Sequence, residues 1–193
     1  MTAADLRPRF APAAAMLLAA VVAAAAQPPA VTDLDGRAVE PLGSRGVATV
    51  LIFTAVDCPI SDRYAPEVRR LAARFAATGV RTWIVYANAG ESPSAARAHA
   101  AAFAYGLPVI LDPDGVLADR AGAVVTPEAA VFDRSGRRVY RGRIDDRYVD
   151  FGVDRPVPTT HDLADAVAAA LDGRPLKPDV VPAVGCAIVR HRP

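Results

Sequence analysis

The chain is poor in cysteine, in lysine and in aromatic residues. Its 193 residues include two cysteines and one lysine, Lys177, and only 6% are aromatic. Two cysteines, Cys58 and Cys186, are too few for a disulfide framework or a four-cysteine zinc site. The 22 Lys and Arg residues are scattered and matched by 21 Asp and Glu, so the sequence has no basic stripe and nucleic acid is not an expected partner. The role of the two cysteines is therefore the main question.

The first 26 residues have the three-part pattern of a secretory signal. Arg7 and Arg9 precede an uncharged Ala/Leu/Val run over 11–26, whose small residues end at Ala26 before the polar Gln27. We expect cleavage after Ala26. The alternative is an uncleaved membrane anchor, although the run is short and mostly Ala for a membrane-spanning helix. We therefore expect an exported protein, periplasmic or otherwise extracytoplasmic, in a compartment where disulfides persist.

Beyond the leader, strand and helix patterns alternate. Residues 47–55 form a nearly unbroken apolar run, which is typical of a strand buried on both faces. From residue 59 the apolar residues recur at three- and four-residue spacing, which predicts an amphipathic helix. The other elements expected in this half are a hairpin over 31–39, a strand over 80–87 and a helix over 93–105.

The second half continues the alternation less regularly. We expect a strand over 107–111, a short helix over 116–121, a hairpin formed by 129–133 and 137–143, and a last helix over 162–171. Thr159 or Thr160 is the predicted cap of that helix and Gly173 its stop. These patterns predict an α/β fold, a three-layer sandwich with a mixed central sheet, spanning residues 27–173. Residues 174–193 form a tail without helical periodicity, which carries Cys186.

Cys58 lies where the buried strand gives way to the amphipathic helix. The free backbone N–H groups and the dipole at a helix start stabilise a thiolate, so we expect the pKa of Cys58 to be lowered. Asp57 opposes this by charge repulsion unless it turns to solvent, and Arg63 favours it. The position predicts a reactive thiol.

Several segments resemble the thioredoxin-like superfamily. The stretch Phe53-Thr-Ala-Val-Asp-Cys58-Pro59 resembles the strand-end motif of exported thioredoxin-like reductants, and Pro66 falls where thioredoxins have the proline that kinks their active-site helix. Thr126-Pro127 resembles their cis-proline. The N-terminal hairpin and the additional strand and helix resemble the redoxin branch, the AhpC/TSA family. Residues 140–146 and 184–188 also resemble exported redoxin-domain proteins with Cys-Pro-x-Ser motifs.

The resemblance implies a thioredoxin-like fold with an N-terminal hairpin and a C-terminal extension. It also implies that Cys58 is the reactive cysteine and that Thr126-Pro127 is a cis peptide facing it, where an extended substrate binds. From the residues alone, Thr126-Pro127 is either that cis peptide or an ordinary trans turn. Pro59 and Ser61 belong to the same site. From the residues alone, Ser61 either caps the helix or hydrogen-bonds the thiolate.

Three positions depart from the patterns of this superfamily. Ser61 stands where dithiol thioredoxins have their second cysteine, so a self-contained Cys-x-x-Cys cycle is impossible. Ala55 stands where peroxiredoxins have a threonine, and Thr54 is one residue too early. Ile52 replaces the buried acid with which many thioredoxins move protons. A second thiol and a proton acceptor must therefore come from elsewhere in the chain.

Cys186 is the candidate for the second thiol. Its tether from the last helix spans up to about 45 Å when extended, against a radius of gyration of about 15 Å for a domain of this size. Cys186 then resolves the bond that Cys58 forms with a substrate. The alternative is a permanent Cys58–Cys186 staple, worth about 5 kcal/mol in the chain-entropy model.

Other polar residues have simpler interpretations. We expect His99 to be a solvated helical residue, and neither His161 nor His191 to be a ligand, because no histidine falls at a local ligand spacing. A Cu(I) site made of the two cysteines and one histidine is the chemical alternative. Asp145-Asp146 are expected in an ion-paired surface turn rather than as general acids.

Together these features predict an exported thiol-disulfide oxidoreductase that needs no cofactor and no metal. Its expected partners are a protein thiol or disulfide substrate and a protein reductant, with membrane contact only if the leader stays uncleaved. One alternative is a thiol peroxidase, in which Cys58 becomes a sulfenic acid that Cys186 condenses with. Another is a thioredoxin-like binding or copper-delivery module without turnover.

Overall fold

A computed structural model describes residues 31–43 and 46–190. The predicted signal peptide, its cleavage site and His191 lie outside these residues. Within the described ranges no helix is long and apolar enough to cross a membrane.

The central strand of the sheet is the apolar run that the sequence marks as buried. All seven residues of β3 (Ala48–Thr54) are buried, and β3 lies between β4 (Arg81–Tyr86), which runs parallel to it, and β7 (Glu128–Asp133), which runs antiparallel. The full order is β11-β8-β7-β3-β4-β5-β1-β2, so the sheet is mixed as predicted. The outer strands are β5 (Val109–Leu111), β8 (Arg138–Gly142), β11 (Val180–Val181), and the predicted N-terminal hairpin β1 (Val31–Asp33) and β2 (Ala38–Val39).

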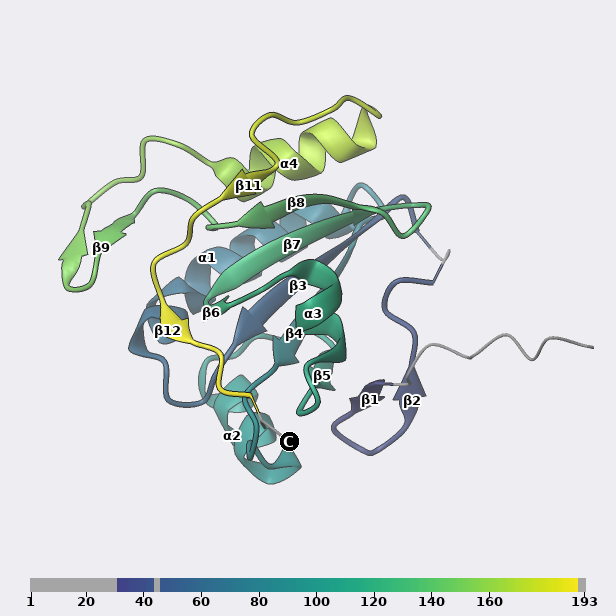
Figure 1. Cartoon of the computed structure of the whole chain (residues 1–193), viewed down its shortest axis with the longest axis vertical. Coiled ribbons are helices and arrows are strands. Elements are labelled where there is room, and N and C mark those ends of the chain that lie inside the picture. Colours follow the sequence, from purple (N-terminus) through teal and green to yellow (C-terminus); the bar gives the residue numbers. More distant parts are fainter. Residues whose placement is uncertain (1–30, 44–45, 191–193) are drawn as a thin grey trace, which may run out of the picture.

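Helices cover both faces of this sheet (Figure 1). α1 (Pro59–Ala76) and α4 (Asp162–Leu171) pack through their apolar faces into one core layer, and α3 (Val116–Ala121) packs into the other. α2 (Pro93–Ala102) begins at the predicted cap Ser92, whose hydroxyl accepts from the amide of Ala95 (3.1 Å), and ends earlier than predicted. The predicted three-layer α/β fold is confirmed.

The predicted cap of the last helix is wrong. α4 begins after His161, whose side chain makes no capping hydrogen bond. The hydroxyls of Thr159 and Thr160 instead donate to the carboxylates of Asp146 and Asp162, and neither residue is in the capping position. The stop is confirmed, because Gly173 follows the helix with a φ of +65°.

Two short pairs of strands lie outside the main sheet. β9 (Tyr148–Asp150) and β10 (Val153–Asp154) form a projecting hairpin. β6 (Val125–Thr126) pairs with β12 (Cys186–Ala187), which belongs to the C-terminal tail. Figure 1 shows this tail running from β11, beside β8, past β6 to the neighbourhood of α2. The tail therefore joins the edge of the sheet to the start of α1.

Candidate functional site

Cys58 is the residue that caps the start of α1. β3 ends at Thr54, the chain turns with the amide of Cys58 donating to the carbonyl of Ala55 (3.4 Å), and the helix starts at Pro59. Proline suits this first helical position because its missing N–H and fixed φ cost nothing there. The side chain of Cys58 is 0% exposed, and Asp57 points to solvent as expected. The predicted position of the thiol is confirmed.

The surroundings of the Cys58 sulfur favour its ionised form. Burial raises the pKa of Cys58, but hydrogen bonds from the side chains of Ser61, Thr126 and Cys186 and from the amide of Ser61 outweigh it, and the pKa is lowered. In the thiol form, Sγ donates to the carbonyl oxygen of Thr126 at 2.9 Å. This carbonyl holds the proton in the resting thiol, and the four donors stabilise the thiolate once the proton leaves.

Ser61 does not cap the helix. It lies in the first turn of α1 and is 1% exposed, and among the described residues its hydroxyl has no hydrogen-bond partner while Cys58 is a thiol. This hydroxyl is the first of the groups that lower the pKa of Cys58. Because Cys58 itself occupies the capping position, the side chain of Ser61 turns inward toward the sulfur. Arg63, expected to favour the thiolate, donates instead to the hydroxyl of Tyr148.

Cys186 lies beside the same carbonyl. In the antiparallel pair of β12 and β6, Cys186 is the partner of Thr126, and the Thr126-Pro127 peptide is cis as predicted. Both cysteines are free. Burial, a hydrogen bond to Cys58, the charge of Cys58 and two nearby aspartates raise the pKa of Cys186 to about 11. The structure therefore brings together the six residues that the sequence predicts for the site: Cys58, Pro59, Ser61, Thr126, Pro127 and Cys186. The pKa of Cys58 is lowered and that of Cys186 is raised, so Cys58 ionises more readily.

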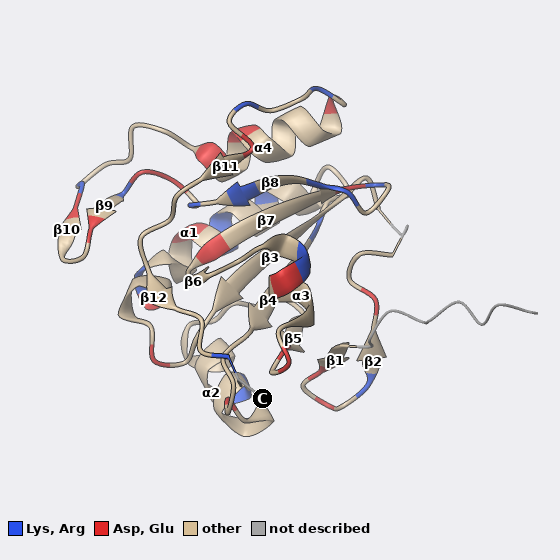
Figure 2. Ribbon diagram, viewed as in Figure 1, with Lys and Arg blue, Asp and Glu red and all other residues tan. Residues whose placement is uncertain are grey.

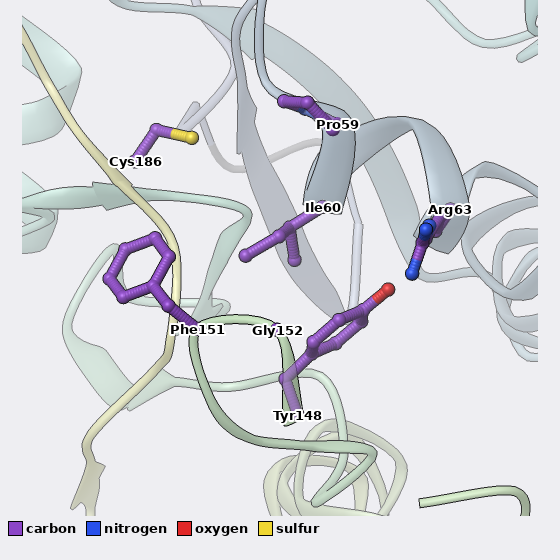
Figure 3. Close-up of a pocket in the computed structure, with 7 residues that line it drawn as sticks. All are labelled: Pro59, Ile60, Arg63, Tyr148, Phe151, Gly152 and Cys186. Atoms are coloured by element: carbon purple, nitrogen blue, oxygen red, sulfur yellow. The ribbon is translucent and has the colours of Figure 1, made fainter. Parts of the chain in front are cut away.

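An open apolar hollow of about 250 Å³ adjoins Cys186. Figure 3 shows its walls: the start of α1 with Pro59 and Ile60, and the β9–β10 hairpin with Tyr148, whose hydroxyl faces Arg63. Phe151 and Gly152 complete the lining together with Cys186. The exposed apolar residues on and after this hairpin are Val149, Phe151, Val153 and Val157. The thiols therefore lie beside a surface suited to apolar side chains of a partner.

His99 is buried rather than solvated, so its sequence interpretation is wrong. Its Nδ1 bonds the hydroxyl of Tyr86 (2.7 Å) and its Nε2 bonds the carboxylate of Asp62 (2.9 Å), one turn along α1 from Cys58. No local spacing signals this contact, because His99 is 37 residues from Asp62 in the chain. His99 thus joins α2 to the first turn of α1.

Asp145 and Asp146 are not in a surface turn. Both are buried, and the carboxylate of Asp145 accepts from the hydroxyl of Tyr64 (2.6 Å). Asp146 accepts from the hydroxyl of Thr159 and from the amides of Thr159 (2.6 Å) and Thr160 (3.0 Å), and it pairs with Arg155 (3.4 Å); these contacts lower its pKa. Asp145 therefore ties its own loop to α1, and Asp146 braces the loop before α4.

Glu91 was missed by the sequence reasoning. Its carboxylate accepts from the amide of Val56 (2.8 Å), two residues before Cys58, and from that of Asn88 (3.3 Å). Burial raises its pKa despite these bonds. Glu91 thereby holds the turn that places Cys58. Among the described residues, no cluster of three or more His, Cys, Asp or Glu side chains is placed to hold a metal ion.

Known proteins resemble the chain over most of its length. The profile of the AhpC/TSA family matches residues 22–140. An uncharacterized conserved protein from Geobacillus kaustophilus is 29% identical, with a TM-score of 0.72 and coverage of 85% of this chain and 88% of its own. A hypothetical protein from Sinorhizobium meliloti 1021 is 25% identical, with a TM-score of 0.72 and coverage of 85% and 91%.

A more distant structure shares the fold alone. It is a secreted disulfide oxidoreductase from Mycobacterium tuberculosis, described as homologous to E. coli DsbE. It is 21% identical, with a TM-score of 0.52 and coverage of 72% of this chain and 94% of its own. No curated protein matches the chain. The predicted thioredoxin-like fold is confirmed by these likenesses.

Proposed function

The chain belongs to the AhpC/TSA family, and on this basis we propose that it is an exported thiol-disulfide oxidoreductase with Cys58 as nucleophile and Cys186 as resolving cysteine. One observation carries the proposal: β12 seats Cys186 opposite Thr126, whose carbonyl accepts the hydrogen bond of the Cys58 thiol. The two thiols of the chain thus meet at a helix start, where a thiolate is stabilised.

The reaction proceeds by two exchanges. The Cys58 thiolate attacks a disulfide of a protein substrate, one substrate sulfur leaves as a thiolate that takes up a proton, and a mixed disulfide forms. Cys186, having lost its proton, attacks Sγ of Cys58, and the second substrate sulfur leaves. The substrate gains two electrons and two protons, and the enzyme keeps a Cys58–Cys186 disulfide. A protein reductant returns both thiols.

The ionisation of Cys186 sets the order of these exchanges. In the resting site, the hydrogen bond to Cys58 and its negative charge help to raise the pKa of Cys186 to about 11. Once Cys58 is in a mixed disulfide it carries no charge, so these two causes disappear. Cys186 then ionises more readily, at the moment when it is needed as the attacking thiolate. A permanent Cys58–Cys186 disulfide would not require the pKa of Cys186 to change during a reaction.

Two further features support a protein substrate outside the cytoplasm. The exposed apolar hairpin beside the thiols offers contact area for a polypeptide. The leader pattern of residues 1–26 supports export, and so does the fold shared with a secreted disulfide oxidoreductase.

Insulin reduction tests the proposal. We expect the parent protein, kept reduced by a dithiol, to reduce insulin disulfides. Cys58→Ser should lose most of this activity, because the remaining thiol, Cys186, lies outside the helix start that stabilises a thiolate. Cys186→Ser should accumulate a mixed disulfide with the insulin chain, visible by mass spectrometry. Activity that Cys58→Ser leaves largely intact contradicts the proposal, and so does an intramolecular disulfide that resists strong reductants.

The second candidate is a thiol peroxidase. Membership of the AhpC/TSA family favours it, and a small oxidant reaches a buried thiol more easily than a protein does. Ala55, at the position of the peroxiredoxin threonine, opposes it. Rapid peroxide consumption with a trapped Cys58 sulfenate, without insulin reduction, would favour the peroxidase. Unreactive thiols that bind Cu(I) stoichiometrically would favour a copper-delivery module.

A further inference from the structure

The strand edge beside Cys58 is occupied by the chain's own tail. Cys186 of β12 pairs with Thr126 of β6, and two residues further on the amide of Ile188 donates to the carbonyl of Val124 (2.9 Å). Neither short strand carries a charged residue (Figure 2). An uncharged backbone edge of this kind pairs with extended polypeptides through main-chain hydrogen bonds. The edge that faces the reactive thiol is thus already filled.

The tail reaches this edge because residue 185 is a glycine. A Cβ at Gly185 would lie 2.7 Å from the carbonyl carbon of Thr126 and 3.3 Å from the nitrogen of Pro127. The first of these separations is shorter than real Cβ atoms show. Gly185 does not have a positive φ, so its conformation is open to other residues. Glycine is therefore needed here for close approach and not for backbone freedom.

The segment over Cys58 is fixed at both ends by hydrogen bonds and an ion pair, and its middle is only partly buried. We call residues 182–187 the strap. Before it, the carbonyl of Val181 in β11 accepts from the amide of Arg143 (3.3 Å). After it, Arg190 donates to the carbonyl of Gly115 (3.0 Å) and pairs with Asp119 (3.1 Å).

Within the strap, apolar burial is partial. Pro182 and Ala187 are exposed and Ala183 is half-buried, whereas Gly185 is buried and the half-buried Val184 and Cys186 pack against the core. Apolar burial is the main stabilising contribution in proteins, and local opening is easiest where it is small. The strap can therefore lift from β6 while both of its ends stay attached.

We propose that the strap is a stand-in strand, and that an extended segment of the polypeptide substrate binds by replacing it on β6. This proposal rests on the proposed function and names how its substrate is bound. The substrate cysteine then takes the position opposite Thr126 that Cys186 has in the resting protein. The residue before it meets the same restriction as Gly185, so substrates with glycine before the reacting cysteine fit best.

Return of the strap completes the exchange. While the substrate strand is on β6, Cys58 is joined to the substrate cysteine and Cys186 is held away. When the strap returns, the Cys186 thiolate forms a bond to Sγ of Cys58, the bond from Cys58 to the substrate sulfur breaks, and that sulfur leaves as a thiolate. The same movement displaces the substrate strand. Resolution of the mixed disulfide and release of the product are therefore one event.

Alkylation of Cys186 tests the exchange without any turnover. In the Cys58→Ser protein Cys186 is the remaining thiol. It is half-buried while the strap is on β6, so its rate of reaction with iodoacetamide rises when the strap is lifted. The probe is a synthetic peptide of residues 180–190 with Ser in place of Cys186. We expect saturating peptide to raise the rate at least tenfold, which corresponds to about 1.4 kcal/mol. The same peptide with Gly185→Val should need at least tenfold higher concentration.

A variant of the protein provides the second arm. Gly185→Ala should raise the alkylation rate of Cys186 at least tenfold without peptide, because the added Cβ pushes the strap off β6. Gly43→Ala is the matched control, since a Cβ there meets its nearest atom at an ordinary 3.5 Å, and its rate should match the parent. If Gly185→Ala fails to fold, the two peptides still test the proposal in the Cys58→Ser protein with Gly185 intact.

Two results would overturn the exchange: an alkylation rate that peptide leaves unchanged or lowers, or equal potency of the Gly and Val peptides. Failure of the proposed function is seen separately. If the parent protein does not reduce insulin but the peptide still exposes Cys186 in the Cys58→Ser protein, the proposed reaction is refuted and the strand exchange stands. Insulin reduction with Cys186 never exposed by peptide refutes the exchange and keeps the reaction.

Discussion

The hydroxyl of Ser61 should set much of the acidity of Cys58. Ser61 stands where dithiol relatives have a second cysteine. Its buried hydroxyl has no partner among the described residues in the resting thiol, so it is free to bond the thiolate, and it lowers the pKa of Cys58. A hydrogen bond to a charged group is worth about 1.5–3 kcal/mol, and one pKa unit corresponds to about 1.4 kcal/mol. Ser61→Ala should therefore raise the pKa of Cys58 by about one to two units and lower the thiolate population at any pH below that pKa.

The ultraviolet absorbance of the thiolate measures this shift directly. The titration is best done with Cys186→Ser, which leaves one thiol and keeps a hydroxyl donor at position 186. Its baseline is the variant that also lacks the Cys58 thiol. Ser94→Ala is the matched control, because Ser94 is exposed on α2 and bonds only Ser92. If Ser61→Ala and Ser94→Ala titrate at the same pH, the hydroxyl of Ser61 does not stabilise the thiolate and this reasoning is refuted.

Two further predictions follow from the same structure. His99→Ala should lower the free energy of unfolding by about 2–3 kcal/mol, because it leaves two hydrogen-bond partners unpaired. The exposed His161→Ala should change it by less than about 0.5 kcal/mol, and urea denaturation of both compares them. Cys58→Ser should lower the pKa of Cys186 from about 11 toward about 8.5, because the bond to Cys58 and its charge are both removed. The pH profile of Cys186 alkylation measures this, and an unshifted profile would leave burial and the nearby aspartates as the cause.

The elements of the sheet and the helices were predictable because their signals are local. The unbroken apolar run of β3 and the spacing of apolar residues in α1 each fix an element within its own residues. The start of α1 after Cys58 follows from the same change of pattern. The expectation of a lowered pKa for Cys58 rested on that start and on Arg63. The direction agrees with the structure, but the side chains of Ser61, Thr126 and Cys186 lower the pKa more than the helix amide does, and Arg63 is not among the causes.

The errors concern contacts between residues far apart in the chain. The hydroxyl of Thr159 was expected to cap α4, but it donates to the carboxylate of Asp146, 13 residues earlier in the chain. His99 looks like a surface residue of an Ala-rich helix until α1 brings Asp62 to it. The position of Cys186 depends on the register of β12 on β6, for which its own segment carries no pattern. The hydrogen-bond partner of a charged or hydroxyl side chain therefore depends on the fold, which brings distant residues together, and cannot be read from the neighbouring sequence.

The pairing of β12 with β6 also decides when the site is completed during synthesis. Cys58 and α1 emerge about 130 residues before Cys186, a delay on the order of 10 s at the usual rate of chain elongation. During that interval the chain can form β3, α1 and the rest of the core, but not the strand that covers Cys58. The reactive thiol is thus open to neighbouring chains until β12 is made, and its protection depends on that strand.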